Sequence, residues 1–184
     1  MATPQTQQQA IWALDTAHTL TEFSARHMMV TTVKGHFQKV AGTITVDESD
    51  LANSSVEVVI ETASVTTGDE RRDGHLRSPD FFNVEQFPLM TFKSTKVESV
   101  DSERLRVAGD LTIRDVTRPV VLEAIINGRG KTPYGKEVAG ISATTKINRK
   151  DFGLTWNVGL ETGGVLVGDE VKISIEAELI NTAN

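Results

Sequence analysis

Histidine is the residue type that would most directly give this sequence catalysis or metal binding. There are four histidines and no cysteine, so a metal site would have to be built from imidazole and oxygen ligands. No two histidines are spaced as HxH or HxxxH, the spacings that place two imidazoles side by side on a strand or a helix. The sequence therefore predicts no metal site, and each histidine has to be considered singly.

His27 is the histidine for which the pattern says most. It alternates with Phe23 and Met29 along one expected strand, so its side chain should point inward among apolar neighbours. Three roles stay open for it: a core group hydrogen-bonded to backbone or carboxylate, a contact to a ligand headgroup, and a metal ligand. For an enzyme, His27 with Asp15 or Arg149 is the one candidate pair of inward titratable groups.

Arg149 is the second residue whose type and position suggest binding. It stands with Asp151 at an expected strand end, where a guanidinium could bind a phosphate or another headgroup oxygen through two hydrogen bonds. An ion pair with Asp151, or with an inward carboxylate such as Asp15, explains the same residue equally well. In another segment, Asp73 and Arg77 are spaced i and i+4, so they could pair on one helix face.

The sequence lacks the short motifs that commonly build active sites. It has no Ser-x-x-Lys, no Gly-x-Ser-x-Gly and no glycine loop of the kind that cradles phosphate. Adjacent carboxylates such as Asp47 and Glu48 fall at expected turns, where we expect them to be solvated. We therefore predict no catalytic residue and no cofactor.

These residues lie on segments in which apolar and polar residues alternate, the pattern of half-buried β-strands. About eight to nine such segments follow one another, with turn signals between them. The clearest are residues 23–29, 40–46, 56–61, 90–95, 105–114, 120–126, 141–147 and 171–179. Short connections favour an all-β fold, an up-and-down antiparallel barrel. With eight strands, its interior is either filled by side chains or holds one small ligand.

One polar segment breaks the strand rhythm. Thr67 and Glu70 have the spacing of a capping box, and Ser78–Pro79 is typical of the start of a second helix. We expect short helices over about residues 68–84 that close one end of the barrel. The Phe81–Phe82 pair on the second helix would then act as a lid over the interior.

Length and composition fit one globular domain. The 184 residues are 39% hydrophobic and 24% charged, which is ordinary for a domain with a sizeable core. Residues 10–182 are expected to form it, after a disordered tail at residues 1–9. The net charge of −6 and the scattered basic residues argue against a nucleic-acid partner.

The first residues have neither the basic region nor the apolar core of a signal peptide, and no later run reaches transmembrane length. We therefore expect a protein that does not span a membrane. Its expected location is cytoplasmic for the chain as written, and periplasmic or secreted if the chain is a processed form.

Several short motifs follow one another in a specific order along the chain. They are the block Arg72–Phe82 (RDGHLRSPDFF), Phe87–Pro88, Ser64–Thr67, Gly109–Ile113, Val116–Val120, Asn148–Gly153 and the opening residues Trp12, Asp15, His18, Phe23 and His27. In order and spacing they resemble the YceI-like family of lipocalin-like barrels, from Trp12 to about Ile180. The resemblance implies an extended eight-stranded barrel around a long apolar cavity. It also implies a carrier of isoprenoid chains, isoprenoid quinones or other long-chain amphiphiles.

The residues of the expected inward faces agree with a cavity. Phenylalanine and methionine outnumber tyrosine, and small residues fall on several strands: Ala25, Gly35, Gly42, Gly109, Ala124, Ala143 and Ala177. Small inward residues leave space, and an apolar space suits a flexible prenyl chain. The residues predicted to contact the ligand are Phe23, His27, Met29, Phe37, Phe81, Phe82, Phe92 and Arg149.

The predicted function is non-catalytic binding, storage or transport of an isoprenoid lipid or a comparable long-chain amphiphile. One alternative is an enzyme that acts on a lipophilic substrate in the same pocket. Another is a filled barrel that serves as an interaction scaffold. The sequence leaves assembly into a homodimer open.

Overall fold

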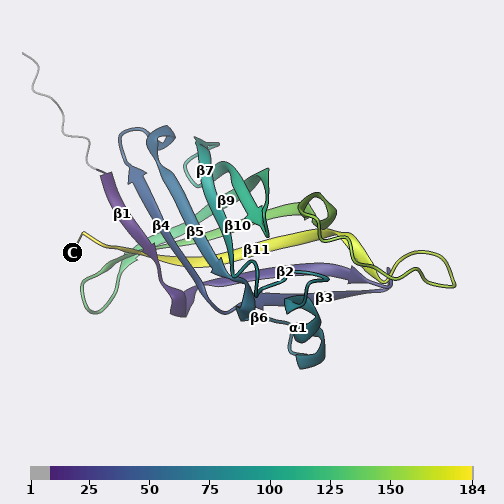
Figure 1. Cartoon of the computed structure of the whole chain (residues 1–184). Coiled ribbons are helices and arrows are strands. Elements are labelled where there is room, and N and C mark those ends of the chain that lie inside the picture. The colour runs from purple at the N-terminus through teal and green to yellow at the C-terminus, as the bar shows by residue number, and fades with distance from the viewer. Residues whose placement is uncertain (1–8, 184) are drawn as a thin grey trace, which may run out of the picture.

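The computed structural model describes residues 9–183, and β-strands make up most of them (Figure 1). The strands are β1 Gln9–Leu14, β2 Leu20–His27, β3 Thr31–Phe37, β4 Val40–Asp47, β5 Ser55–Glu61, β6 Val65–Thr66, β7 Leu89–Ser99, β8 Arg104–Ile113, β9 Val116–Lys131, β10 Glu137–Asn148 and β11 Val167–Asn181. One α-helix, α1, spans Glu70–Arg77. The 3-10 turns are η1 Thr16–His18, η2 Leu51–Asn53, η3 Thr62–Ser64 and η4 Arg149–Phe152.

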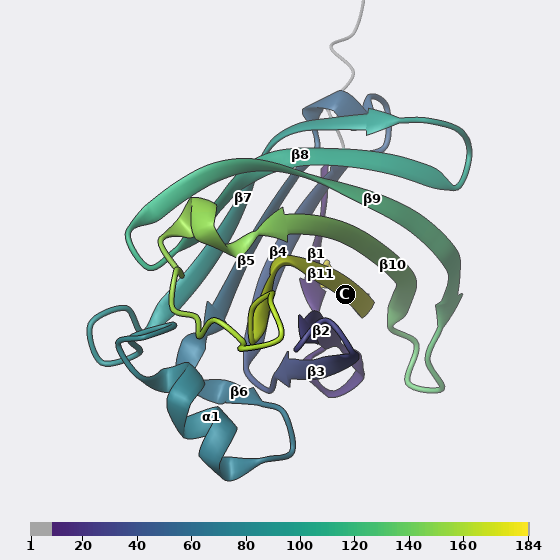
Figure 2. The ribbon, with the colours of Figure 1, turned by 90° about the vertical axis from the view of Figure 1, so that its right-hand side faces the viewer.

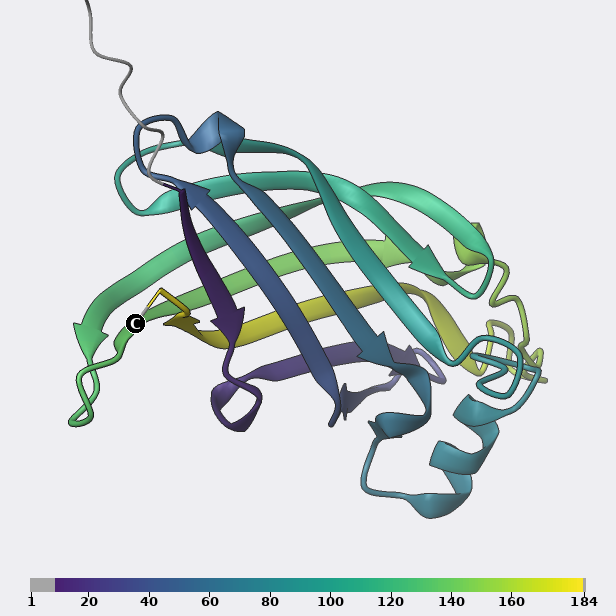
Figure 3. The ribbon, with the colours of Figure 1, turned by 60° about the vertical axis from the view of Figure 1, so that its left-hand side comes forward.

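Eight strands form a closed antiparallel ring, which confirms the predicted barrel. Their order is β1-β4-β5-β7-β8-β9-β10-β11, and β11 returns to β1 with Trp12 opposite Asn181. In Figure 3 the strands β1, β4, β5 and β7 slant across the front wall. Trp12 is buried against Ala139 and Leu179 at the end of the barrel where the ring closes. The predicted tail at residues 1–9 lies outside the described residues, except Gln9, which begins β1.

The remaining strands extend one wall of the barrel. β11 is long enough to pair with β1 near its C-terminal end and with β2 along its N-terminal half. The sheet continues from β2 to β3 and β6, and α1 packs beside β6. Figure 2 shows α1 and β6 at one side of the barrel end. Among residues 9–183 no helix is long and apolar enough to cross a membrane.

The segment after β6 contains one helix where two were expected. The N-cap of α1 is Asp69, whose carboxylate accepts the Arg72 N–H at 2.9 Å. Thr67 does not cap the helix because its hydroxyl donates to Asp73 instead, at 2.6 Å. The expected second helix is replaced by turns, in which the N–H of Phe82 bonds the carbonyl of Leu76 at 2.9 Å.

Polar side chains of α1 fasten it to the barrel wall. Asp73 is 3% exposed and accepts both the N–H and the hydroxyl of Thr67. Burial by itself would raise the pKa of Asp73, but these hydrogen bonds hold the pKa below its ordinary value. Arg77 donates to the carbonyls of Ala63 and Val65 at 3.0 Å each. Asp73 and Arg77 thus each hold the preceding segment, where the sequence had suggested a pair with each other.

The space beside three inward glycines is filled by neighbouring side chains, contrary to the expectation that these glycines leave space. A Cβ at Gly35 would lie 2.5 Å from the Phe23 ring, and one at Gly109 would lie 2.5 Å from the Phe92 ring. A Cβ at Gly42 would lie 2.7 Å from Leu14. Each glycine therefore allows a bulky side chain of the neighbouring, paired strand to lie flat over it.

Gly109→Ala tests this packing. The new methyl group would also meet the Lys93 carbonyl at 2.6 Å, which cannot move aside without disturbing the β7–β8 pairing. We expect the free energy of unfolding to fall by about 1–3 kcal/mol, as for other overpacked sites. Gly130→Ala is the control, since its nearest neighbour is 3.9 Å away. Urea denaturation of both variants measures the difference, and equal stabilities would contradict the packing argument.

Candidate functional site

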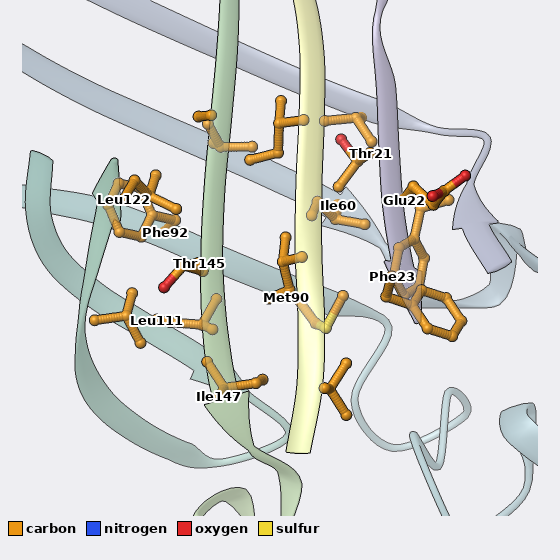
Figure 4. A pocket seen from close by; sticks show the side chains of 18 of the residues that line it. Thr21, Glu22, Phe23, Ile60, Met90, Phe92, Leu111, Leu122, Thr145 and Ile147 are labelled. Atoms are coloured by element: carbon orange, nitrogen blue, oxygen red, sulfur yellow. The ribbon is translucent and has the colours of Figure 1, made fainter. Parts of the chain in front are cut away.

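The barrel encloses an apolar cavity of about 310 Å³, which is the candidate functional site. Every strand of the closed ring contributes lining residues, and so do β2, β3, α1 and the turn after it. Figure 4 shows Met90, Phe92, Leu111, Leu122 and Ile147 among the side chains that line it. The volume falls within the range of about 300–1,000 Å³ that is usual for small-molecule sites.

Strand alternation explains why the lining is apolar. On β11 the cavity side carries Ile173, Ile175, Ala177 and Leu179, and the polar residues between them face outward. From Val167 to Leu179 the lining follows the strand for about 40 Å, at roughly 3.3 Å per residue. The site is therefore a long apolar tube, and the four inward alanines, Ala25, Ala124, Ala143 and Ala177, line it as expected.

Few polar residues reach the cavity. Apart from Arg149, the polar lining residues are Thr19, Thr21, Thr145 and Glu22 (Figure 4). The carboxylate of Glu22 accepts from Lys34 at 2.9 Å, so its charge is already paired. Within the described part of the chain, the buried Thr19 hydroxyl has no hydrogen-bond partner. A ligand would thus meet hydroxyl groups rather than a free charge.

Arg149 lines the cavity, but its donors are engaged by the protein itself. It is 4% exposed, and Nη1 donates to the carbonyls of Leu154 at 2.6 Å and Trp156 at 2.9 Å. Nε donates to Gly168 O at 3.0 Å and Nη2 to Val167 O at 3.3 Å. Arg149 therefore joins the chain after η4 to the start of β11.

Charge around Arg149 agrees with this structural role. Burial lowers the pKa of Arg149, and the nearby Asp169 carboxylate acts in the opposite direction. Nη2 of Arg149 lies 3.5 Å from that carboxylate, while Asp169 also pairs with Lys150 at 3.0 Å. The ion pair once suggested with Asp151 or Asp15 is formed with Asp169 instead.

Six of the eight residues predicted to contact a ligand line the cavity. They are Phe23, Phe37, Phe81, Phe82, Phe92 and Arg149. Their contact with a ligand stays a prediction. Sequence reasoning did not single out the aliphatic lining of β8 to β11, although the alternation of those strands carried the signal.

His27 and Met29 were wrongly placed in the cavity. Both are exposed, Met29 to 57%, and neither lines the tube. Strand parity gives the correct side for Phe23 and Ala25, which line the tube. His27 is the last residue of β2, directly before the turn to β3, and its side chain is exposed there.

Two groups of aromatic side chains cover the α1 end of the cavity. Phe82 packs edge-on against Phe37, with ring centroids 5.6 Å apart, and Phe37 in turn packs against Phe23. His75 lies between Phe81 and Trp156, at centroid distances of 5.0 and 4.5 Å, and its Nε2 lies 2.8 Å from Asp80. Phe81 and Phe82 are therefore in the position expected for a lid.

Two polar clusters away from the cavity are explained as turn structure. Asp15 caps η1, and its carboxylate lies 2.7 Å from Nδ1 of His18. Glu178 lies 3.9 Å from the same nitrogen. In residues 9–183 these three residues are the one group of His and carboxylate side chains compact enough for a metal ion. Asp47, expected to be solvated, is instead fully buried and accepts hydrogen bonds from Ser49 and from the N–H of Asp50. Neither cluster opens into the tube.

The fold and the tube define the class of a lipocalin-like barrel with an internal apolar site. The chain belongs to the YceI-like family, because the YceI-like domain model matches residues 12–179. A UPF0312 protein of Staphylococcus aureus strain N315 is 36% identical over 168 residues, covering 91% of this chain and 95% of that protein.

Two solved structures show the same architecture. The Campylobacter jejuni YceI protein is 35% identical, with a TM-score of 0.71 over 86% of this chain and 90% of that one. A polyisoprenoid-binding domain from Saccharophagus degradans is 16% identical, with a TM-score of 0.65 over 92% of this chain and 98% of that one. At that identity the second similarity bears on the fold alone.

Arg149→Met should destabilise the protein strongly, because several buried carbonyls would lose their donor. We expect a loss of about 3–5 kcal/mol in the free energy of unfolding. Arg149→Lys should recover little of the lost stability, since one ammonium group cannot reach carbonyls on both segments. The neighbouring exposed pair provides the control: Lys150→Met should cost about 1 kcal/mol or less. Similar losses for Met at positions 149 and 150 would contradict the structural role.

Proposed function

We propose that this protein binds an isoprenoid lipid, or a comparable long-chain amphiphile, inside the barrel without transforming it, and stores or carries that lipid. The observation that carries the proposal is the long tube whose lining is apolar along nearly its whole length. A chain of methylene and methyl groups is the ligand shape that such a tube fits. Membership of the YceI-like family supports the proposal.

Burial of the chain supplies the driving force. Each buried CH₂ contributes about 0.8 kcal/mol, so a chain of several prenyl units offsets the loss of its own freedom and of overall motion. The cavity walls are paired strands of the closed ring, and so little of this energy is spent on rearranging the protein. A barrel filled by its own side chains, the scaffold alternative, would not leave this space.

The lining argues for a ligand with a neutral headgroup. Among residues 9–183, Arg149 is the one cation that lines the tube; it donates to four backbone carbonyls and cannot also hold a phosphate. The hydroxyls of Thr19, Thr21 and Thr145 can bond the carbonyl or hydroxyl of a quinone or a prenyl alcohol. We therefore place a neutral isoprenoid inside the tube.

The enzyme alternative has less support from the same residues. It required His27 with Asp15 or Arg149, but His27 lies outside the tube and Asp15 pairs with His18. The titratable lining groups, Glu22 and Arg149, are each engaged by protein partners. General acid–base catalysis needs such a group within hydrogen-bond reach of the reacting atoms.

Filling the tube tests lipid binding. Ala143→Phe places a ring in the middle of β10, on the cavity side, and takes the space of several methylene groups. We expect the affinity for a fluorescent prenyl analogue to fall about tenfold or more. Thr144→Phe is the matched control, because the next side chain on the strand points outward and is exposed. If both variants fold and bind like the parent protein, the ligand does not occupy the tube.

Headgroup charge gives a second test. A prenyl alcohol and the prenyl phosphate of equal chain length bury the same hydrocarbon, so any difference in affinity comes from the head. We expect the alcohol to bind about tenfold tighter or more, since a phosphate inside the tube would have no free cation. Competition against a bound fluorescent analogue measures both. Equal or tighter binding of the phosphate would overturn the neutral-headgroup assignment and leave lipid binding itself intact.

A further inference from the structure

The connection between β2 and β3 exposes three consecutive apolar side chains. Met28, Met29 and Val30 are 44%, 57% and 72% exposed. Single exposed apolar residues are common on protein surfaces, but a contiguous group at the end of a hairpin is not. Figure 1 places this hairpin end at the right of the molecule, away from the C-terminus. We call residues 28–30 the tip.

The backbone of the tip is unfavourable for the residues it contains. Met28 and Met29 have φ values of 52° and 60°, in the left-handed region, and the turn is closed by the Val30 N–H on the carbonyl of His27 at 3.0 Å. Two successive left-handed residues are the geometry for which Asn-Gly is strongly preferred, and methionine is not. Stability of the hairpin therefore does not explain why methionine stands at both positions.

Several polar backbone groups of the tip have partners within the protein. Arg26 donates from Nη2 to the carbonyls of Met29 at 3.1 Å and Val30 at 3.3 Å. The N–H of Met28 donates to the carbonyl of Leu166 at 2.8 Å. Paired backbone groups lower the cost of bringing the apolar side chains into a lipid interface.

The tip lies beside the end of the lipid-binding tube. Ala25 and Val167 line the tube, and Val167 pairs with His27 just before the tip. The hydrogen bond to Leu166 joins the tip to a second hairpin, residues 157–167, where Val158 is 47% exposed. The tip and the second hairpin thus lie together at the end of the molecule away from the C-terminus (Figure 1).

Charges near the tip balance, although the protein as a whole is acidic. The chain carries −6, yet residues 24–36 contain Arg26 and Lys34, two histidines and no carboxylate. The facing hairpin, residues 157–167, contributes one carboxylate, Glu161, and Glu22 pairs with Lys34. An apolar segment without excess negative charge around it can enter a headgroup layer without being repelled.

We propose that the tip docks on a lipid bilayer, inserting Met28, Met29 and Val30 among the headgroups with Arg26 at their level. Docking sets the end of the tube against the membrane, where a prenyl lipid can pass between the bilayer and the barrel. This proposal rests on the proposed function for its purpose, but membrane docking can be measured separately.

The test replaces the tip by the residues that its backbone prefers. Met28→Asn with Met29→Gly removes two apolar side chains and relieves the left-handed strain, so the melting temperature should rise by about 2–4 °C. Binding to vesicles of phosphatidylethanolamine and phosphatidylglycerol in equal parts should fall about tenfold or more. Val30→Ser, outside the left-handed positions, should weaken vesicle binding without raising the melting temperature. Val59→Ser, on the barrel wall and 41% exposed, should change neither.

Vesicle co-sedimentation and stopped-flow transfer of a fluorescent prenyl analogue give the readouts. The parent protein should bind these vesicles about as tightly when salt is raised, because apolar insertion is not screened by ions. Tip variants should bind the analogue in detergent-free solution as the parent does, while transferring it to vesicles about tenfold more slowly. Docking would be overturned if the parent protein does not bind the vesicles, or if the tip variants bind them as tightly as the parent does. Either result would leave the proposed function standing. Loss of analogue binding by every protein, with docking intact, would instead count against the proposed function.

Discussion

Closure of the sheet along β11 is the constraint on which the rest of the structure depends. This strand pairs with β10 along one edge, and along the other edge it pairs first with β2 and then with β1. The backbone hydrogen bonds of the ring are thereby made between neighbouring strands around its circumference. Because the ring is held partly by these bonds, its interior can stay hollow and apolar, which a fold that depends on a filled core could not allow.

The polar residues at the α1 end belong to this architecture. Arg149 joins two chain segments through their carbonyls, and Asp73 and Arg77 attach α1 to the segment before it. Each of these charges is partly or wholly removed from water, a cost that its hydrogen bonds offset. The same bonds leave these groups unable to act on a ligand, so groups that look reactive in the sequence stabilise the end of the tube.

The residues of the tip, in contrast, do not stabilise the fold. A pair of methionines in left-handed backbone lowers stability and adds exposed apolar surface. Sites where local preference and structure disagree are where function is to be sought. Interpreting the tip as a membrane contact makes the loss of stability part of how the barrel exchanges its ligand.

Alternation of apolar and polar residues determined the strands, the closed barrel and the inward direction of residues such as Phe23 and Phe92, because strand periodicity is local. The tertiary structure alone decided which hydrogen-bond partner a side chain takes and which side chains fill a given space. Thr67 could not cap α1 once its hydroxyl bonded Asp73, and the space expected at Gly109 was taken by the Phe92 ring. Parity likewise predicted an inward His27, but the side chain is exposed at the end of β2, because parity gives the side of a strand and not how far its packed neighbours extend.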